Sequence, residues 1–199
     1  MTPVVVGRLI SLARPDPRFF PLAASWINDH EIGRTLITGV PWPITTEEVA
    51  YWLPTTFPLT AFFIWPNALL DPPAGEDGAA QPAESRPVGL CHFHTFDRAA
   101  KCIKLAILLE PSAQGRGFGS EAVMHMLEYA FSTFDLNRVA LSAFSNNPGG
   151  LRAYARAGFK TEGVRRRAWY RDGEWLDDVL MAVLRRDWEA RLPRSEEPG

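Results

Sequence analysis

The residues best suited to chemistry lie in one glycine-rich stretch, Gln114-Gly115-Arg116-Gly117-Phe118-Gly119. Residues 103–109 before it form an apolar run of strand length, and apolar residues after it recur at helical spacings from 122 to 134. Glycines let the backbone approach a ligand closely, and a helix N-terminus carries partial positive charge. This order of strand, turn and helix predicts a phosphate-binding cradle, to which Arg116 adds a charged donor.

Two common nucleotide cradles do not fit this stretch. A P-loop requires a Lys-Ser or Lys-Thr pair after its last glycine, whereas Gly119 is followed by Ser120-Glu121. The dinucleotide fingerprint needs a different glycine spacing and an acidic residue about 20 positions further on. The phosphate-bearing ligand therefore belongs to another class.

The pattern Gln-x-x-Gly-x-Gly resembles the pyrophosphate-binding motif of the GNAT superfamily of acyl-CoA-dependent N-acetyltransferases. Downstream, Asn147, Tyr154, Gly158 and Phe159 match the family's Asn-x(6)-Tyr-x(3)-Gly-Phe signature, and residues 165–178 are similar to the closing hairpin of its Rim-type branch. The resemblance implies a mixed α/β fold with a central, splayed, mostly antiparallel sheet flanked by helices. It also implies acetyl-CoA as the co-substrate.

The resemblance assigns the cofactor-binding roles residue by residue. Gln114 to Gly119 would hold the pyrophosphate, and the main chain of Ile107, Leu108 and Leu109 would hold the pantetheine arm. One N–H group of this strand would polarise the thioester carbonyl, a contribution typically worth about 3 kcal/mol per donor. Asn147 is expected both to cap its helix and to reach the cofactor arm.

Tyr154 matches the tyrosine that commonly serves the family as general acid toward the leaving thiolate. The family's frequent acidic base on the central strand aligns with Lys104, which in its charged form cannot accept a proton. The base is therefore open between His92, His94 and Glu110. Deprotonation relayed by water, without a dedicated base, is the remaining alternative.

The expected acceptor is a primary amine, either a peptide N-terminus or a small amine, in a cleft with aromatic walls. The candidate walls are Trp26, Trp42, Trp52, Trp169, Tyr170 and Trp175, and the candidate acids are Glu31, Glu47, Glu48, Asp177 and Asp178. Two alternatives stay open: a non-catalytic acyl-CoA sensor of the same fold, and an enzyme that uses another acyl-CoA or modifies an antibiotic.

Composition and charge argue against several kinds of partner and site. A net charge of −2 argues against broad nucleic-acid binding. Cys91 and Cys102 indicate reduced core thiols, and alternation along the strand separates Cys91 from His92 and His94, so no metal site is expected. Without a signal peptide or a long apolar run, a cytoplasmic protein that avoids membranes is expected. A homodimer is plausible by resemblance only.

The elements that must position these residues follow from periodicity and turn signals. We predict one domain over 1–199, with a flexible internal loop at 66–87 and a tail at 189–199. Thr45 and Glu48 have the spacing of a capping box, which predicts a helix start. The predicted strands are 4–12, 60–65, 88–94, 103–109, 138–144, 159–168 and 175–184, and the other predicted helices are 16–26, 122–134 and 148–157.

Overall fold

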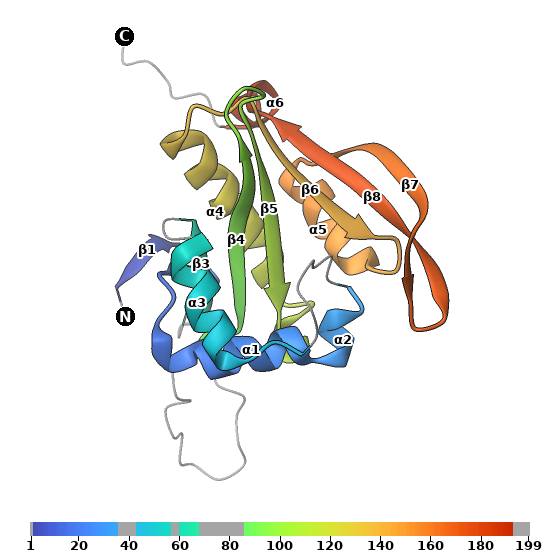
Figure 1. Ribbon diagram of the computed structural model, residues 1–199. Coiled ribbons are helices and arrows are strands. Elements are labelled where there is room, and N and C mark those ends of the chain that lie inside the picture. Colours follow the sequence, from blue (N-terminus) through green and yellow to red (C-terminus); the bar gives the residue numbers. More distant parts are fainter. Residues whose placement is uncertain (1, 36–42, 57–59, 68–85, 193–199) are drawn as a thin grey trace, which may run out of the picture.

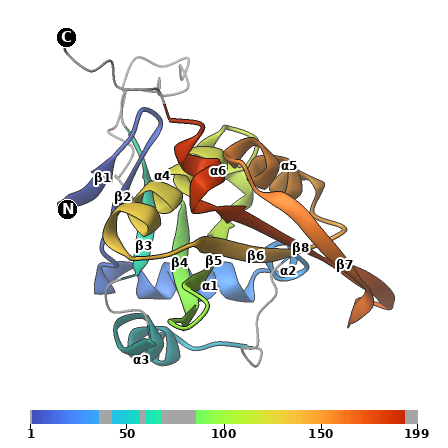
Figure 2. The same cartoon turned by 90° about the horizontal axis from the view of Figure 1, so that it is seen from above.

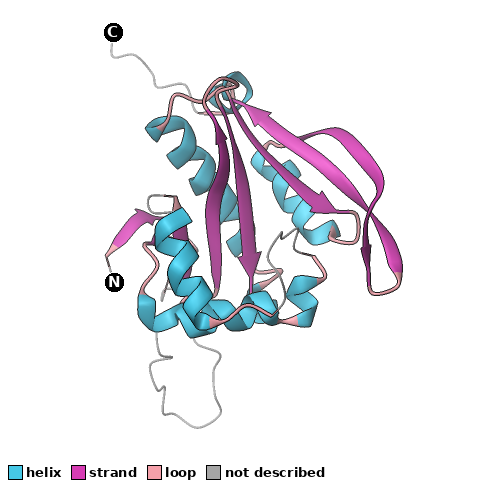
Figure 3. Cartoon of the chain, viewed as in Figure 1, coloured by secondary structure: helices cyan, strands magenta, loops and turns pink. Residues whose placement is uncertain are grey.

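The computed structural model describes residues 2–35, 43–56, 60–67 and 86–192. In chain order the elements are β1 (Pro3–Val6), β2 (Ile10–Ala13), α1 (Phe20–Asn28), α2 (His30–Gly33), α3 (Thr46–Thr56), β3 (Ala61–Pro66), β4 (Gly89–Asp97), β5 (Cys102–Leu109), α4 (Phe118–Thr133), β6 (Arg138–Phe144), α5 (Pro148–Ala157), β7 (Lys160–Arg171), β8 (Glu174–Leu184) and α6 (Arg185–Glu189). Within these ranges the strands form one sheet in the order β1-β2-β3-β4-β5-β6-β8-β7. Figures 1 and 3 show the sheet and its helices.

The sheet is mostly antiparallel, because among its described pairs only β5 and β6 run parallel. Helices cover both faces (Figure 2). One core cluster joins the sheet to α4 and α5, and a second joins the other face to α1 and α3. The predicted mixed α/β fold is confirmed. No helix in the described ranges is both long and apolar enough to cross a membrane.

The sheet splits between β5 and β6. These strands pair only where Cys102, Ile103 and Lys104 face residues 138–140, whereas β4 follows β5 as far as Leu109. Beyond Lys104 the two parallel strands diverge, and the opening widens toward α2 (Figure 1). Backbone groups on the open edge of β5 therefore have no neighbouring strand. This is the splayed sheet that the sequence motifs imply.

Most predicted elements match the observed ones closely. The capping box of α3 is confirmed: the Thr45 N–H donates to Glu48 Oε2 (2.7 Å), and the Glu48 N–H donates to Thr45 Oγ1 (3.1 Å). The single predicted strand at 4–12 is wrong. It is a hairpin of β1 and β2, closed by the Gly7 N–H, which donates to the carbonyl oxygen of Ile10 (2.9 Å).

Two predicted segments fall largely outside the described residues. Residues 68–85 of the expected loop at 66–87 and residues 193–199 of the expected tail are not described. The described parts of those segments include Pro66, which ends β3, and Glu189, which ends α6, a short helix that the sequence pattern did not predict.

Candidate active site

The cradle at the start of α4 has the backbone geometry of an anion site. Gly115 and Gly117 have φ of +74° and +87°, in the left-handed region where side chains other than glycine are strained. Gly117 is the N-cap of α4, and no side chain caps this helix end. The first N–H groups of a helix have no intrahelical acceptor, so they are available to an anionic ligand.

Side chains fix the cradle to the central strand. Gln114 Nε2 donates to the carbonyl oxygen of Leu109 (3.2 Å), which ties the turn to the end of β5. Phe118 is fully buried and anchors the first turn of α4 in the core. The exposed Arg116 lies with its guanidinium carbon 4.7 Å from the Phe118 ring centroid, a cation–π contact that holds positive charge at the helix end.

Glu121, in the first turn of α4, holds the cradle to the β1–β2 hairpin, a role that the sequence did not indicate. It is buried, and both of its carboxylate oxygens lie 3.0 Å from the backbone nitrogen of Leu9. It therefore joins the first turn of α4 to the β1–β2 hairpin. The contact spans 112 residues of sequence, so no local signal could have indicated it.

Along β5, the backbone N–H and C=O groups of successive residues point alternately toward β4 and toward the opening. The Glu110 N–H donates to the carbonyl oxygen of Val88 (2.9 Å), so groups two residues back, at Leu108, also point toward β4. Those of Ile107 and Leu109 point the opposite way, into the split. Of the three predicted backbone positions, Ile107 and Leu109 therefore present groups to the opening, and Leu108 belongs to the β4–β5 ladder.

The helix α5 places Asn147 and Tyr154 on the same side of the sheet as the cradle. Asn147 is the N-cap and its Oδ1 accepts a hydrogen bond from the Gly150 N–H (2.8 Å). A Cβ atom at Gly150 would lie 2.7 Å from Asn147 Nδ2, so the capping side chain accounts for a glycine here. Tyr154 packs in the core cluster that also contacts Ile107 and Leu109.

Tyr154 is a protonated phenol in this setting. Its side chain is buried, and burial raises the pKa of Tyr154 to about 12 because the phenolate would lose its hydration. The ring lies against Phe159, with ring centroids 6.1 Å apart. The group can therefore donate a hydrogen bond or a proton at every pH in the ordinary range.

His92 and His94 lie on the opposite face of the sheet. Their β4 neighbours Cys91 and Phe93 pack with α4 and α5, so the two imidazoles point toward α3, where Trp52 lies 6.1 Å from His92 between ring centroids. Burial and then His94 lower the pKa of His92 to about 3, and burial and then Lys104 lower the pKa of His94. Both rings are neutral near pH 7.

Glu110 is held in an ion pair. Burial acts to raise the pKa of this carboxyl, but the Arg86 guanidinium and the Ser112 hydroxyl outweigh it and bring the pKa below its usual value. Arg86 donates to both oxygens (2.7 and 3.1 Å), and Ser112 Oγ donates to Oε1 (2.7 Å). The carboxylate is thus ionised and already occupied by donors, which makes it a weak base for an incoming amine.

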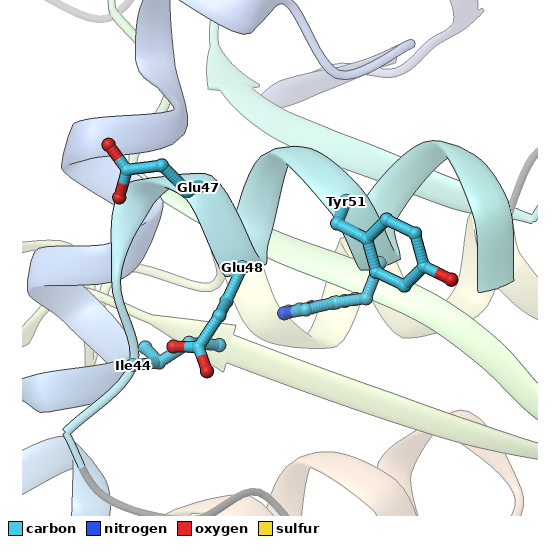
Figure 4. A pocket seen from close by; sticks show the side chains of 5 residues that line it. Ile44, Glu47, Glu48 and Tyr51 are labelled. Carbon is cyan, nitrogen blue, oxygen red and sulfur yellow. The ribbon is translucent and has the colours of Figure 1, made fainter.

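A shallow pocket of about 360 Å³ lies along α3, on the histidine face (Figure 4). It is lined by Ile44, Glu47, Glu48, Tyr51 and Trp52. Two carboxylates beside two aromatic rings suit a positively charged amine. No three His, Cys, Asp or Glu side chains in the described ranges gather closely enough to hold a metal ion.

Comparison with known proteins agrees with this geometry. Residues 10–160 match the family described as acetyltransferase (GNAT) domain. The chain belongs to the GNAT acetyltransferase family. Every predicted site residue, from His92 to Tyr154, lies within the matched range.

Relatives of this GNAT chain include the YdaF and YjcK proteins of Bacillus subtilis, with 30% identity over 101 residues and 32% over 97 residues. The matches cover 51% and 49% of this chain and 55% and 54% of those proteins, so the chain spans about half the length of these relatives. The ribosomal protein uS5-alanine N-acetyltransferase of Escherichia coli is 28% identical over 112 residues, which are 56% of this chain and 58% of that protein.

Solved structures confirm the GNAT fold over nearly the whole chain. Spermidine N-acetyltransferase from Vibrio cholerae, in complex with CoA and spermine, has a TM-score of 0.72 at 16% identity and covers 91% of this chain and 98% of its own. The ribosomal-protein-S5-alanine acetyltransferase of Vibrio fischeri has a TM-score of 0.71 at 18% identity, with 92% and 97% covered. At these identities the likeness concerns the fold.

Proposed function

We propose that this GNAT chain transfers an acetyl group from acetyl-CoA to a primary amine, by direct attack of the amine on the thioester. One observation carries the proposal: the uncapped N-terminus of α4, with left-handed Gly115 and Gly117, lies next to the end of β5, where that strand separates from β6. An anion site and an open strand edge side by side fit the pyrophosphate and the pantetheine arm of one extended cofactor.

The chain's own groups would then act as follows. The N–H groups of the α4 start and Arg116 hold the pyrophosphate. Backbone groups of Ile107 and Leu109 orient the pantetheine arm, and an N–H among them stabilises negative charge that develops on the carbonyl oxygen. Tyr154, protonated and buried, gives its proton or a hydrogen bond to the departing sulfur.

The proposed amine approaches from the histidine face, where Glu47, Tyr51 and Trp52 line the pocket on α3. Neither histidine is both basic enough and close enough to the opening to take the proton from the amine. His92 lies opposite Ala106, beside the split, but its pKa is about 3; His94 lies opposite Lys104, where β5 and β6 still pair. We therefore propose that water relays the proton from the amine to bulk solvent. A cytoplasmic location belongs to the same proposal.

A thiol-release assay with acetyl-CoA and a panel of peptides and polyamines tests this function. We expect CoA release that depends on an amine, and a loss of about 100-fold or more in kcat for Tyr154→Phe with unchanged acetyl-CoA affinity by calorimetry. Tight acetyl-CoA binding without turnover on any amine would instead support a sensor. Absence of acetyl-CoA binding at millimolar concentration would contradict the proposed cofactor site.

A further inference from the structure

A fully buried carboxylate lies in the sheet away from the cradle. Asp178 on β8 has no exposed side-chain surface. Its Oδ2 accepts hydrogen bonds from Nε (3.0 Å) and Nη2 of Arg165. Its Oδ1 is sealed from solvent and has no hydrogen-bond partner in the part of the chain that the structure describes. A buried carboxylate oxygen without a donor is costly, so this oxygen calls for a donor beyond the described residues.

A second sealed group lies on the same face of the sheet. Trp169 Nε1 is buried and has no acceptor among the described residues. In the register, Asp178 faces Phe144 on β6, and Trp169 on β7 faces Leu176, two residues before Asp178. Side chains at such positions share one face of a sheet. The Trp169 and Phe144 ring centroids are 5.9 Å apart although β8 lies between their strands, so the two rings meet above the strand that carries Asp178.

This face is the one from which the amine is proposed to approach. The β6 neighbours Leu141 and Ala143 pack with α4 and α5, so Phe144 points to the other side of the sheet, where α1 to α3 lie. Arg171 connects this region to α2: its Nη1 donates to the carbonyl oxygen of Gly33 (3.1 Å), and its guanidinium carbon lies 5.7 Å from the Phe144 ring centroid. The unmet acceptor and the unmet donor therefore lie on the α2 side of β8 and β7, and β6 separates them from the opening.

The acceptor oxygen of Asp178 and the donor N–H of Trp169 together distinguish peptide acceptors from polyamine acceptors. A peptide unit carries an N–H donor and a carbonyl acceptor, so one backbone amide can satisfy both Asp178 Oδ1 and the Trp169 N–H. A protonated polyamine offers donors only and would leave the indole N–H unmet. We infer that Asp178 and Trp169 form a subsite for a backbone amide of the acceptor, so that the acceptor is a peptide with a free N-terminus. This inference rests on the proposed function.

Entry to the subsite requires the indole to turn, since both polar atoms are sealed in the free protein. The position of Trp169 in the sheet leaves its side chain less restrained than one on an inner strand. Trp169 lies on β7, an edge strand of the described sheet, directly after an irregularity in the β7–β8 register between Arg165 and Trp169. An edge strand with a bulge has fewer ladder hydrogen bonds to restrain a side chain.

Trp169→Phe tests the subsite, because it removes the N–H and keeps an aromatic ring. We expect KM for a peptide acceptor to rise about tenfold, with kcat, the acetyl-CoA affinity and KM for spermidine unchanged. Asp178→Asn is expected to raise the peptide KM likewise. Trp188→Phe on α6 is the matched control: it makes the same change at a ring that packs against Phe131 (5.1 Å between ring centroids) on the other face of the sheet, and should leave the peptide KM unchanged.

Unchanged peptide KM in Trp169→Phe, or equal increases for peptide and spermidine, would overturn the inference and indicate an internal water between the two groups. Peptide binding to the CoA-saturated protein, measured by calorimetry in the wild type and Trp169→Phe, separates this result from a failure of the proposed function. If no amine is acetylated, a tenfold loss of peptide affinity in Trp169→Phe still supports the subsite, and equal affinities refute it.

Discussion

A negative charge placed at Gly117 should weaken acetyl-CoA binding by a calculable amount. We compare Gly117→Asp with Gly117→Asn, since both side chains tolerate the left-handed conformation that φ of +87° requires. Each adds a Cβ atom 3.1 Å from Leu9 Cδ1, the end of a flexible side chain that can shift. Backbone strain and capping of the helix by the new side chain are therefore similar in both, and the pair differs mainly in one charge.

The expected magnitude follows from Coulomb's law. Two unit charges about 6 Å apart interact by about 3 kcal/mol at an effective dielectric constant near 20, and solvent at this exposed turn reduces that to about 2 kcal/mol. Because about 1.4 kcal/mol corresponds to a tenfold change, Gly117→Asp should bind acetyl-CoA about 30-fold more weakly than Gly117→Asn.

Calorimetric titration of both variants at low and high salt gives the measurement, with thermal melting to verify that both are folded. The difference should shrink as salt rises, since screening acts on the charge and leaves strain unaffected. Equal affinities of the two variants at low salt would show that the pyrophosphate does not lie at this helix end, and would refute the cradle.

Three further predictions concern the residues around the split. His92 has a pKa of about 3 in the folded protein and about 6.5 in the unfolded chain, so the unfolded state gains a proton first and stability is lost as pH falls below 6.5. Between pH 7 and pH 5 the free energy of unfolding, measured with urea, should fall by about 2 kcal/mol more in the wild type than in His92→Gln. Equal losses in the two proteins would contradict the low pKa of His92. Glu110→Gln should lower the unfolding free energy by about 1–3 kcal/mol through its contacts with Arg86, without moving the pH profile of kcat/KM; a displaced profile would restore Glu110 as the base. Gly150→Ala should destabilise the wild type but stabilise an Asn147→Gly background by up to about 1 kcal/mol in thermal or urea melts, because the clash with the cap is then gone; stabilisation in both backgrounds would refute the clash.

The sequence predicted the local conformation of the cradle and of α5 well. The cradle depends on glycines at positive φ followed at once by a helix, and both requirements are local and visible as spacing. The same holds for α5, whose start at Asn147 and end at Gly158 are set by a capping side chain and a left-handed glycine.

The general base could not be predicted from the sequence, because the pKa of a side chain depends on neighbours that are far from it along the chain. Glu110 is occupied by Arg86, 24 residues earlier in the chain, and His92 is neutral because of what buries it. The hairpin at the N-terminus shows the same limit. Residues 4–12, which open with three valines, predict one strand, whereas the turn at Leu9 is fixed by Glu121 on α4.

The sequence by itself therefore determined the order of the elements, the conformation of the cradle and the cap of α5, since each follows from dihedral preferences and periodicity within a few residues. Tertiary structure decided which backbone groups of β5 face the opening, which candidate bases are accessible, and where Asp178 and Trp169 lie relative to each other. These depend on strand register and burial, which arise from contacts between residues far apart in the chain, and no local pattern encodes them.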